Sequence, residues 1–527
     1  MPVAKDSAAV ASTPASAAGL NAAKPVAARR KHSYRDILSS SALIGGSSAI
    51  NVCIGIVRTK AMAMLLGPAG YGVMGAYMQI AEVARSVAQM GLTGSGVRQI
   101  ADAVASGDNE RIGRTVKVLR VVSLLCALLG AALLAALSAP ISTLTFGDDG
   151  HAGGVALLSC ALFFTVLAGS QGALLQGMRR IADLAKIAVL GGLLGTAIGI
   201  PLVYAFGEVG LVPTLVAMAA ISLLTSWWYS RRIDVPMPVL GWSGMTTEAG
   251  ALLKLGVAFM ASGLLMNGAA YAVRTIVLRK VGLDAAGIYF AAWTMGGLYI
   301  GFVLQALGTD FYPRLVGVIQ DHEECNRVVN EQAQVSLLLA VPGVLATLTL
   351  APLVIALFYS SEFTAAVGVL RWICLGMAVR VLTWPIGYIV VAKNAQTLFL
   401  AIEVAWTVIN VGLTWWCVDA FGVDGAGIAF LAANVLHAFM VYPIVRRLSG
   451  FRWSNANLKL AIACFLLMAG TFTGFQLLPP MVAMAAGVVA TIASAWISVR
   501  TLTALVSPQN MPARLQRLLR LQRGNDN

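Results

Sequence analysis

The sequence predicts an all-α integral membrane protein of about 14 transmembrane helices, forming two pseudo-symmetric six-helix lobes and two appended helices. Three observations lead to this class: the composition, the length of the apolar runs and an internal repeat. Of 527 residues, 58% are hydrophobic and only 11% are charged, and the mean hydropathy is +0.80. Soluble domains are about 45–50% apolar and about 25% charged. The composition therefore excludes a soluble enzyme, a disordered chain and a nucleic-acid-binding protein.

Each predicted helix is a run of about 20 apolar residues, which is long enough to cross the hydrocarbon core of a bilayer. Short loops with Gly, Pro, Asp and Asn separate the runs. None has the alternating pattern of a barrel strand, so helices are expected. The predicted spans cover residues 38–57, 72–93, 116–138, 152–173, 184–206, 210–230, 250–275, 285–306, 335–358, 365–391, 397–418, 425–445, 458–478 and 481–503.

The positions of lysine and arginine predict that both chain ends lie in the cytoplasm. Most of the 37 Lys and Arg residues occur in the N-terminal segment, in every second loop and in the C-terminal segment. The alternate loops contain only Arg58, Lys60, Arg279 and Lys280. Because cytoplasmic loops carry an excess of positive charge, this bias sets the orientation and accounts for the net charge of +14 without nucleic acid.

The predicted domain boundaries follow from these spans. Residues 1–36 are rich in Ala, Ser and Pro and are expected to form a disordered cytoplasmic tail. Residues 37–232 form the N-lobe with spans 1–6, 233–448 the C-lobe with spans 7–12, 449–505 the two appended spans, and 506–527 a basic cytoplasmic tail. The segment 514–520 has basic and leucine faces, and it either lies on anionic lipid headgroups or is a solvated tail.

The two lobes are expected to be copies of one unit, because matches recur at an offset of about 215 residues. An even number of spans per copy gives both lobes the same topology, with an axis along the membrane normal. Such an arrangement encloses a cleft between the lobes, which suits a transporter better than an enzyme. The matched positions are 56–59 with 272–275, Asn51 with Asn267, Gly67 with Gly282, Gly72 with Gly287, Ala76 with Ala291, and 206–210 with 421–425.

Several short segments, rich in glycine and small residues, recur in a characteristic order: 66–72 and its echo 281–289, 91–97, 362–364, 387–393 and 403–404. Through these segments, residues 36–448 resemble the multidrug/oligosaccharidyl-lipid/polysaccharide exporter superfamily, and within it the Wzx-type flippases of lipid-linked O-antigen repeat units. The resemblance implies transfer of an undecaprenyl-pyrophosphate-linked oligosaccharide across a bacterial inner membrane, for polysaccharide export. Its partners would be that substrate, membrane lipids and a glycan polymerase or chain-length machinery.

Arginines inside the spans are the expected head-group ligands. A charge at the centre of a span costs about 2.5–3.5 kcal/mol on insertion scales, so it needs a reason. The planar guanidinium donates paired hydrogen bonds to phosphate oxygens and stays protonated. For Arg58 the alternative is snorkelling to the outer headgroups. The candidates are Arg58, Arg85, Arg274, Arg371 and Arg380.

Two carboxylates are candidates for ion coupling. Glu82 lies three residues before Arg85, on one helix face, so it either forms an internal ion pair or takes up H⁺ or Na⁺ during transport. Glu403 offers the same choice. Asn51, Asn267, Asn410 and Asn434 are polar positions on spans, for which hydrogen bonding between helices is the default explanation.

No cofactor, metal site or enzymatic activity is expected. The sequence lacks GxxxxGK[ST], HExxH and GxSxG, and its seven cysteines show no metal-ligand spacing. The alternatives are a cation-coupled small-molecule exporter and a flippase of the lipid II type. Spans 1 and 7 contain no carboxylate, which weakens the small-molecule exporter alternative. The outside loop after span 1 is a short Gly-rich turn, which weakens the lipid II flippase alternative. The short outside loops also argue against a glycan polymerase.

Overall fold

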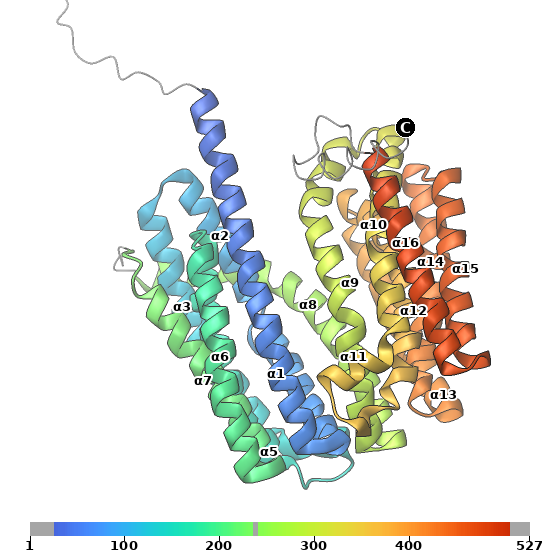
Figure 1. Ribbon diagram of the computed structural model, residues 1–527. Coiled ribbons are helices and arrows are strands. Elements are labelled where there is room, and N and C mark those ends of the chain that lie inside the picture. The colour runs from blue at the N-terminus through green and yellow to red at the C-terminus, as the bar shows by residue number, and fades with distance from the viewer. Residues whose placement is uncertain (1–25, 236–240, 506–527) are drawn as a thin grey trace, which may run out of the picture.

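The computed structural model describes residues 26–235 and 241–505, which form a bundle of helices joined by short turns (Figure 1). The predicted all-α class is confirmed. Two short 3₁₀ helices, η1 (Gly207–Gly210) and η2 (Ser361–Phe363), interrupt the series. The α-helices are α1 (Val26–Ala88), α2 (Leu92–Ser106), α3 (Asn109–Ala136), α4 (Ser138–Phe146), α5 (Ala152–Gly177), α6 (Ile181–Phe206), α7 (Leu211–Ser230), α8 (Trp242–Val281), α9 (Leu283–Val318), α10 (His322–Thr349), α11 (Ala351–Phe358), α12 (Ala366–Ala392), α13 (Gln396–Phe421), α14 (Asp424–Ser449), α15 (Asn455–Leu477) and α16 (Pro480–Leu505).

Twelve stretches of the described residues are long and apolar enough to cross a membrane, compared with the 14 spans expected. The difference arises because two stretches each contain two of the expected spans. Ile50–Ala88 is broken at Gly67, whose φ of 62° and ψ of −175° reverse the chain, and Ile181–Ser230 contains α6, η1 and α7. The chain is therefore a multi-pass membrane protein in which tight turns join neighbouring spans.

The N-terminal boundary differs from the expected one. Helix α1 begins at Val26, so residues 26–36 are helical and do not belong to a disordered tail. Ala, Arg and Lys dominate the segment 27–31 and are strong helix formers, so the helix extends beyond the apolar span. Residues 1–25 and the basic tail 506–527, with its segment 514–520, lie outside the described residues.

The internal repeat is visible in the backbone as well as in the sequence. Gly67 and Gly282, which are matched in the repeat, both end a span with positive φ and ψ near 180°. Gly207 and Gly422 end α6 and α13 with φ of 56° and 60°. Both helices are 26 residues long. The chain thus turns in the same way at equivalent points of its two halves.

Non-glycine turn residues repeat too. Arg179 precedes α6 and Asn394 precedes α13, and they have φ of 56° and 57°. The side chains of Asp108 and Asp321 cap α3 and α10 by accepting hydrogen bonds from backbone N–H groups. Because these residue pairs share little sequence identity around them, the duplicated backbone is a stronger sign of the repeat than the residues.

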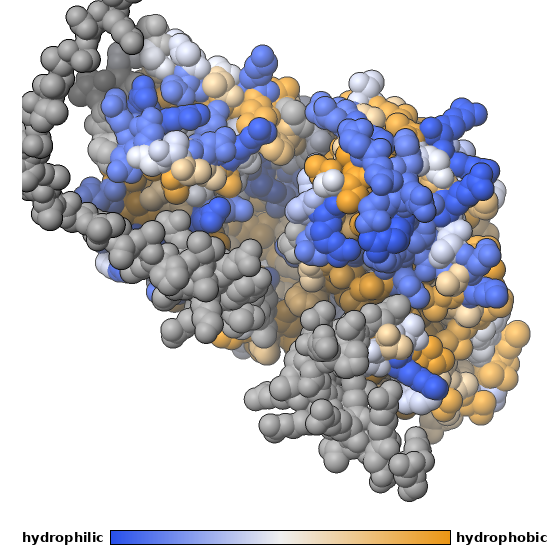
Figure 2. Space-filling view, turned by 90° about the horizontal axis from the view of Figure 1, so that it is seen from above, coloured by the Kyte–Doolittle hydropathy of each residue, from blue (hydrophilic) through white to orange (hydrophobic). Residues whose placement is uncertain are grey.

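The helices form two groups that meet at one end and diverge at the other (Figure 1). Helices α1–α7 make the first group and α9–α16 the second. Helix α8 crosses from the first group to the second, and its C-terminal part, with Arg274 over Phe290 of α9 and Lys280 bound to Asp419 of α13, is counted with the second group. We call the end at which α1 begins the open end and the opposite end, with the turn at Gly67, the closed end. Seen from the open end, the surface is hollowed between the two groups (Figure 2). Helices α15 and α16 pack on α10 at the edge of the second group, away from the first.

Glycines let the two groups touch at the closed end. A Cβ atom on Gly287 would lie 1.9 Å from the carbonyl oxygen of Pro68, and one on Gly72 would lie 2.3 Å from that of Leu283. The two glycines are repeat mates, and so are Pro68 and Leu283, so the contact is symmetric. Next to it, the ring centroid of Tyr71 lies 5.2 Å from that of Phe290. The closed end is therefore a backbone contact sealed by aromatic packing.

Replacing Gly287 with Ala should destabilise the protein, because the added methyl group overlaps the backbone of the opposite group. Overpacking of a tight contact typically costs about 1–3 kcal/mol. We expect a lower midpoint of thermal unfolding in detergent. Gly268→Ala is the matched control, since a Cβ atom there meets no atom within 4 Å. Equal midpoints for the two variants would contradict the tight contact.

Candidate functional site

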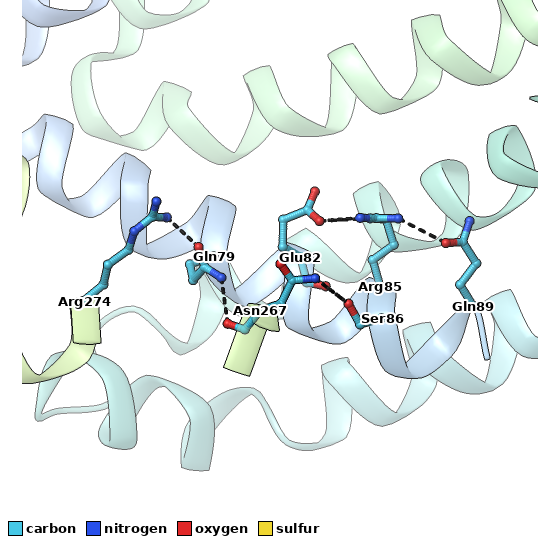
Figure 3. Close-up of polar contacts among 7 residues, drawn as sticks. All are labelled: Gln79, Glu82, Arg85, Ser86, Gln89, Asn267 and Arg274. Carbon is cyan, nitrogen blue, oxygen red and sulfur yellow. Dashed lines mark hydrogen bonds and ion pairs between the residues drawn. The ribbon is translucent and has the colours of Figure 1, made fainter. Parts of the chain in front are cut away.

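A line of polar side chains follows the seam between α1 and α8 (Figure 3). On α1, beyond the break at Gly67, the polar residues recur at intervals of three or four and so share one helix face. They meet polar residues of α8 across the seam. The residues drawn in the figure are Gln79, Glu82, Arg85, Ser86 and Gln89 of α1 and Asn267 and Arg274 of α8.

Arg274 is at the end of this line that is nearer the closed end. Its Nη1 donates a hydrogen bond of 2.5 Å to Oε1 of Gln79, which is only 5% exposed. Its guanidinium carbon lies 4.7 Å from the centroid of the Phe290 ring. No carboxylate of the described residues pairs with it. The structure thus holds a cation at membrane depth with a neutral partner, and most of its donors stay free.

A small pocket lies beside the Arg274 guanidinium, between the two helix groups. The small residues Gly72, Gly75 and Ala76 of α1 form one wall, and Tyr271 of α8 lines another. The Tyr271 hydroxyl lies 2.6 Å from Oγ1 of Thr145 in α4, the last residue but one of that helix. Because side chains of α1, α4, α8 and α9 line this pocket, it depends on contact between the groups.

Asn267 joins the groups through hydrogen bonds. Its side-chain Nδ2 donates to Oγ of Ser86 at 2.8 Å, and its backbone carbonyl oxygen accepts from Nε2 of Gln79 at 3.0 Å. The default explanation for this asparagine, hydrogen bonding between helices, is confirmed. Gln79 therefore contacts Arg274 and Asn267 at once and links two positions of α8.

Glu82 and Arg85 form the internal ion pair that was one of the two alternatives for them. The distance from Nη2 to Oε2 is 2.5 Å, and the side chains are 48% and 32% exposed. Arg85 also donates to Oε1 of Gln89 at 3.1 Å. The pair partly neutralises Arg85, so this arginine offers less positive charge to an anion than Arg274 does.

Arg58 and Arg274 both act electrostatically on the Tyr71 hydroxyl at the closed end. Arg58 makes no direct hydrogen bond or ion pair with the described residues, and it is half-buried. Its role at a head group therefore stays a prediction, as does the alternative of snorkelling to the outer headgroups.

Arg380 and Glu403 belong to a separate cluster in the second helix group, in which Arg380 is exposed and Glu403 is half-buried. Arg380 of α12 is within electrostatic range of Glu403 of α13 and of His437 of α14, without a direct ion pair. No residue of α1–α7 takes part. The structure therefore does not bring Arg380 or Glu403 together with Glu82 or Arg85.

Arg371 differs from the other candidates in its surroundings. Its Nε donates to the carbonyl oxygen of Leu348 at 3.3 Å, and its guanidinium lies 3.7 Å from the ring centroid of Phe475. Phe475 is in α15, at the edge far from the first helix group (Figure 1). The Arg371 guanidinium therefore lies against an appended helix, and its role in a head-group site stays a prediction.

Sequence reasoning missed Gln79, Ser86 and Gln89, since it considered only charges and asparagines as site residues. Their spacing with Glu82 was a usable signal, because positions 79, 82, 86 and 89 describe one face of a helix. No group of three or more His, Cys, Asp or Glu residues that could hold a metal ion occurs in the described ranges.

Two basic side chains join the helix groups at the closed end. Lys60 of α1 donates to the carbonyl oxygens of Ala356, at 2.5 Å, and of Tyr359, at the C-terminal end of α11. Arg279 of α8 donates to the carbonyl oxygen of Thr143 at 2.7 Å, near the C-terminal end of α4. Cations are favoured at helix C-termini, where carbonyl groups are unpaired.

These two contacts, which we call the clasps, have equivalent acceptor positions, although their donors Lys60 and Arg279 are not matched in the repeat. Thr143 and Ala356 lie at the same position of α4 and α11, and each clasp runs from one helix group to the other. Lys280, next to Arg279, instead binds Oδ2 of Asp419 at 2.5 Å within the second group. Three of the four basic residues of the alternate loops thus have defined partners.

Comparison with known proteins agrees with this architecture. A family model described as polysaccharide biosynthesis protein matches residues 61–368, more than half of the chain. The chain is 23% identical to the lipid III flippase of Escherichia coli K12 over 413 residues, which cover 76% of this chain and 96% of that protein. It is 24% identical to a putative O-antigen transporter of Shigella flexneri, over 47% of this chain and 60% of that one.

Solved structures share the fold at low identity. An inward-facing MATE transporter of the MOP superfamily has a TM-score of 0.63 with 18% identity, over 77% of this chain and 95% of that chain. The lipid II flippase MurJ in an inward closed conformation also has a TM-score of 0.63, with 13% identity over 88% and 99% of the two chains. The chain belongs to the polysaccharide biosynthesis protein family and has the fold of the MOP exporter superfamily.

Proposed function

We propose that this protein is a flippase for an undecaprenyl-pyrophosphate-linked oligosaccharide, which it moves across a bacterial inner membrane by alternating access. The observation that carries the proposal is Arg274, a cation at membrane depth in the seam between the helix groups, with which no carboxylate of the described residues pairs. Its free donors match the oxygens of a pyrophosphate, which needs a replacement for its water shell. Relatives described as flippases of lipid III and lipid II and as an O-antigen transporter support this substrate class.

The proposed cycle uses the two ends of the molecule in turn. The head group enters the hollow at the open end and reaches Arg274, while the polyprenyl tail stays in lipid. Separation of Gly72 from Gly287 and release of the clasps then open the closed end. With both chain ends in the cytoplasm, as the lysine and arginine bias indicates, the open end faces inward and the closed end faces outward.

Glu82 and Glu403 are the proposed coupling residues. Glu82 is half exposed in the seam, so uptake of H⁺ or Na⁺ there would compete with its ion pair to Arg85. Such competition would free Arg85 for the head group, so substrate and ion binding would be linked. A glycan polymerase or chain-length protein is the proposed partner that receives the flipped unit.

A cation-coupled small-molecule exporter is the second candidate, since the MATE transporters share the fold. The charge of the seam favours the flippase, because an unpaired Arg274 repels a cationic drug and attracts a phosphate. Deletion of the gene would distinguish the two functions. It would abolish surface glycan if the protein is a flippase, and energy-dependent efflux if it is an exporter.

Arg274→Ala should reduce flipping of a lipid-linked oligosaccharide in reconstituted vesicles by about tenfold to a hundredfold, because a hydrogen bond to a charged group contributes about 1.5–3 kcal/mol. Surface polysaccharide in cells should fall with it at equal membrane abundance. Arg274→Lys should lie in between, since it retains the charge and loses the fork geometry.

Arg371→Ala is the matched control, because it removes an arginine of α12 that lies outside the seam. It should leave the flipping rate close to that of the wild type. Normal flipping by Arg274→Ala, or an equal loss in both variants, would contradict the proposed role of Arg274.

Loss of both clasps should favour opening of the closed end. The probe is a cysteine at position 76, in the pocket between the groups, in a background without the native cysteines. When an impermeant thiol reagent is added from the outer face, this cysteine should react several-fold faster in the double variant Lys60→Ala/Arg279→Ala than in the same background with both clasps intact. The double variant should exceed both single variants, because the clasps act in parallel.

The control for this experiment is Lys280→Ala, which removes a neighbouring cation that binds within one helix group. It should leave the reaction rate at position 76 unchanged. An unchanged rate in the double variant would show that the clasps do not hold the closed end.

A further inference from the structure

A second basic pocket lies within the first helix group, apart from the seam. Side chains of α3, α5 and α7 and of the segment after α7 form it, at the C-terminal end of α7. It shares no residue with the pocket beside Arg274. Its polar lining consists of Arg120, Gln171, Ser230, Arg231 and Asp234.

The Arg120 guanidinium in this pocket lacks acceptors. Its one hydrogen bond, from Nη2 to Oε1 of Gln171, is long at 3.4 Å, and that oxygen already accepts a bond of 2.8 Å from Oγ of Ser230. Its Nε is buried without a hydrogen-bond partner. No carboxylate pairs with it within the described part of the chain. Since buried donors are normally satisfied, the arrangement calls for an additional acceptor.

Arg231 supplies a second cation at the same pocket. Its guanidinium carbon lies 4.6 Å and 4.0 Å from the ring centroids of Trp227 and Trp228, which hold it in place. Asp234 also lines the pocket, but forms no ion pair with either arginine, so the two cations outweigh the single carboxylate. A net positive pocket with free N–H donors has the chemistry of a phosphate site.

The aromatic residues locate this pocket in the membrane. Trp227 and Trp228 are 47% and 46% exposed, at the end of a spanning helix. Tryptophan and tyrosine gather at the boundary between hydrocarbon and headgroups. We infer that the pocket of Arg120 and Arg231 binds a phosphate group at this boundary, supplied by the headgroup of an anionic phospholipid or by free phosphate.

Binding can be measured on the full-length protein in neutral detergent through its midpoint of thermal unfolding. Three probes would be titrated: dioctanoyl phosphatidylglycerol, zwitterionic dioctanoyl phosphatidylcholine and inorganic phosphate. A ligand that binds the folded state raises the midpoint. The wild type should respond saturably to the anionic lipid and not to the zwitterionic one. In Arg120→Gln the apparent dissociation constant should rise by at least about tenfold.

Arg232→Gln is the matched control, because Arg232 stacks on Trp228 and Tyr229 but does not line the pocket. It should retain the wild-type response. If Arg120→Gln folds poorly, Gln171→Glu provides a second test, since a carboxylate beside Arg120 fills its donors and repels an anion. That variant should lose the response as well.

The probes distinguish the two sources of phosphate. A response to the lipid alone assigns a headgroup site, and a response to inorganic phosphate with the same dependence on Arg120 assigns a free-phosphate site. No response in the wild type, or one that persists in Arg120→Gln and Gln171→Glu, would overturn the inference. The readout does not involve flipping, so it is independent of the proposed function.

Discussion

A charge at membrane depth needs a partner within the protein, because hydrocarbon offers none, and this constraint organises the molecule. Arg85 is satisfied by Glu82 on its own helix. Arg371 donates one hydrogen bond to a carbonyl group and lies over an aromatic ring of the second helix group. Arg274 alone among these three takes its hydrogen bond from the opposite helix group, through Gln79. Any movement of the groups therefore changes the surroundings of that guanidinium, which couples the site to the conformation.

Duplication of one unit explains how the closed end is built. The repeat mates Gly72 and Gly287 each lie against the backbone of the opposite helix group, so the same kind of glycine–backbone contact occurs twice. The clasps add one contact from each group to a short helix of the other, with Lys60 on α11 and Arg279 on α4. Opening of the closed end requires both clasps to release. A second close glycine contact, between Gly91 and Gly256, joins the turn after α1 to α8 farther along the seam. The surface at the open end is hollow (Figure 2).

The basic residues of the alternate loops gain a structural meaning from these contacts. By charge bias alone they are exceptions to an otherwise consistent pattern. In the structure, Lys60 and Arg279 neutralise the carbonyl ends of short helices, and Lys280 pairs with Asp419. Three of these four basic residues therefore join helices, whereas Arg58 makes no direct hydrogen bond or ion pair with the described residues.

The sequence by itself determined the helical class, the turns at the matched glycines and the duplication, because the period and length of apolar runs depend on local chain geometry. It also indicated Arg274, since a charge inside a span is conspicuous. Tertiary structure alone decided the surroundings of each arginine: Arg274 meets α1 across the seam, Arg371 lies over a ring of α15, and Arg380 is near Glu403 and His437. It also revealed Gln79, a neutral residue. Contacts between helices far apart in the chain depend on packing angles and rotations, which leave no periodic trace in the sequence.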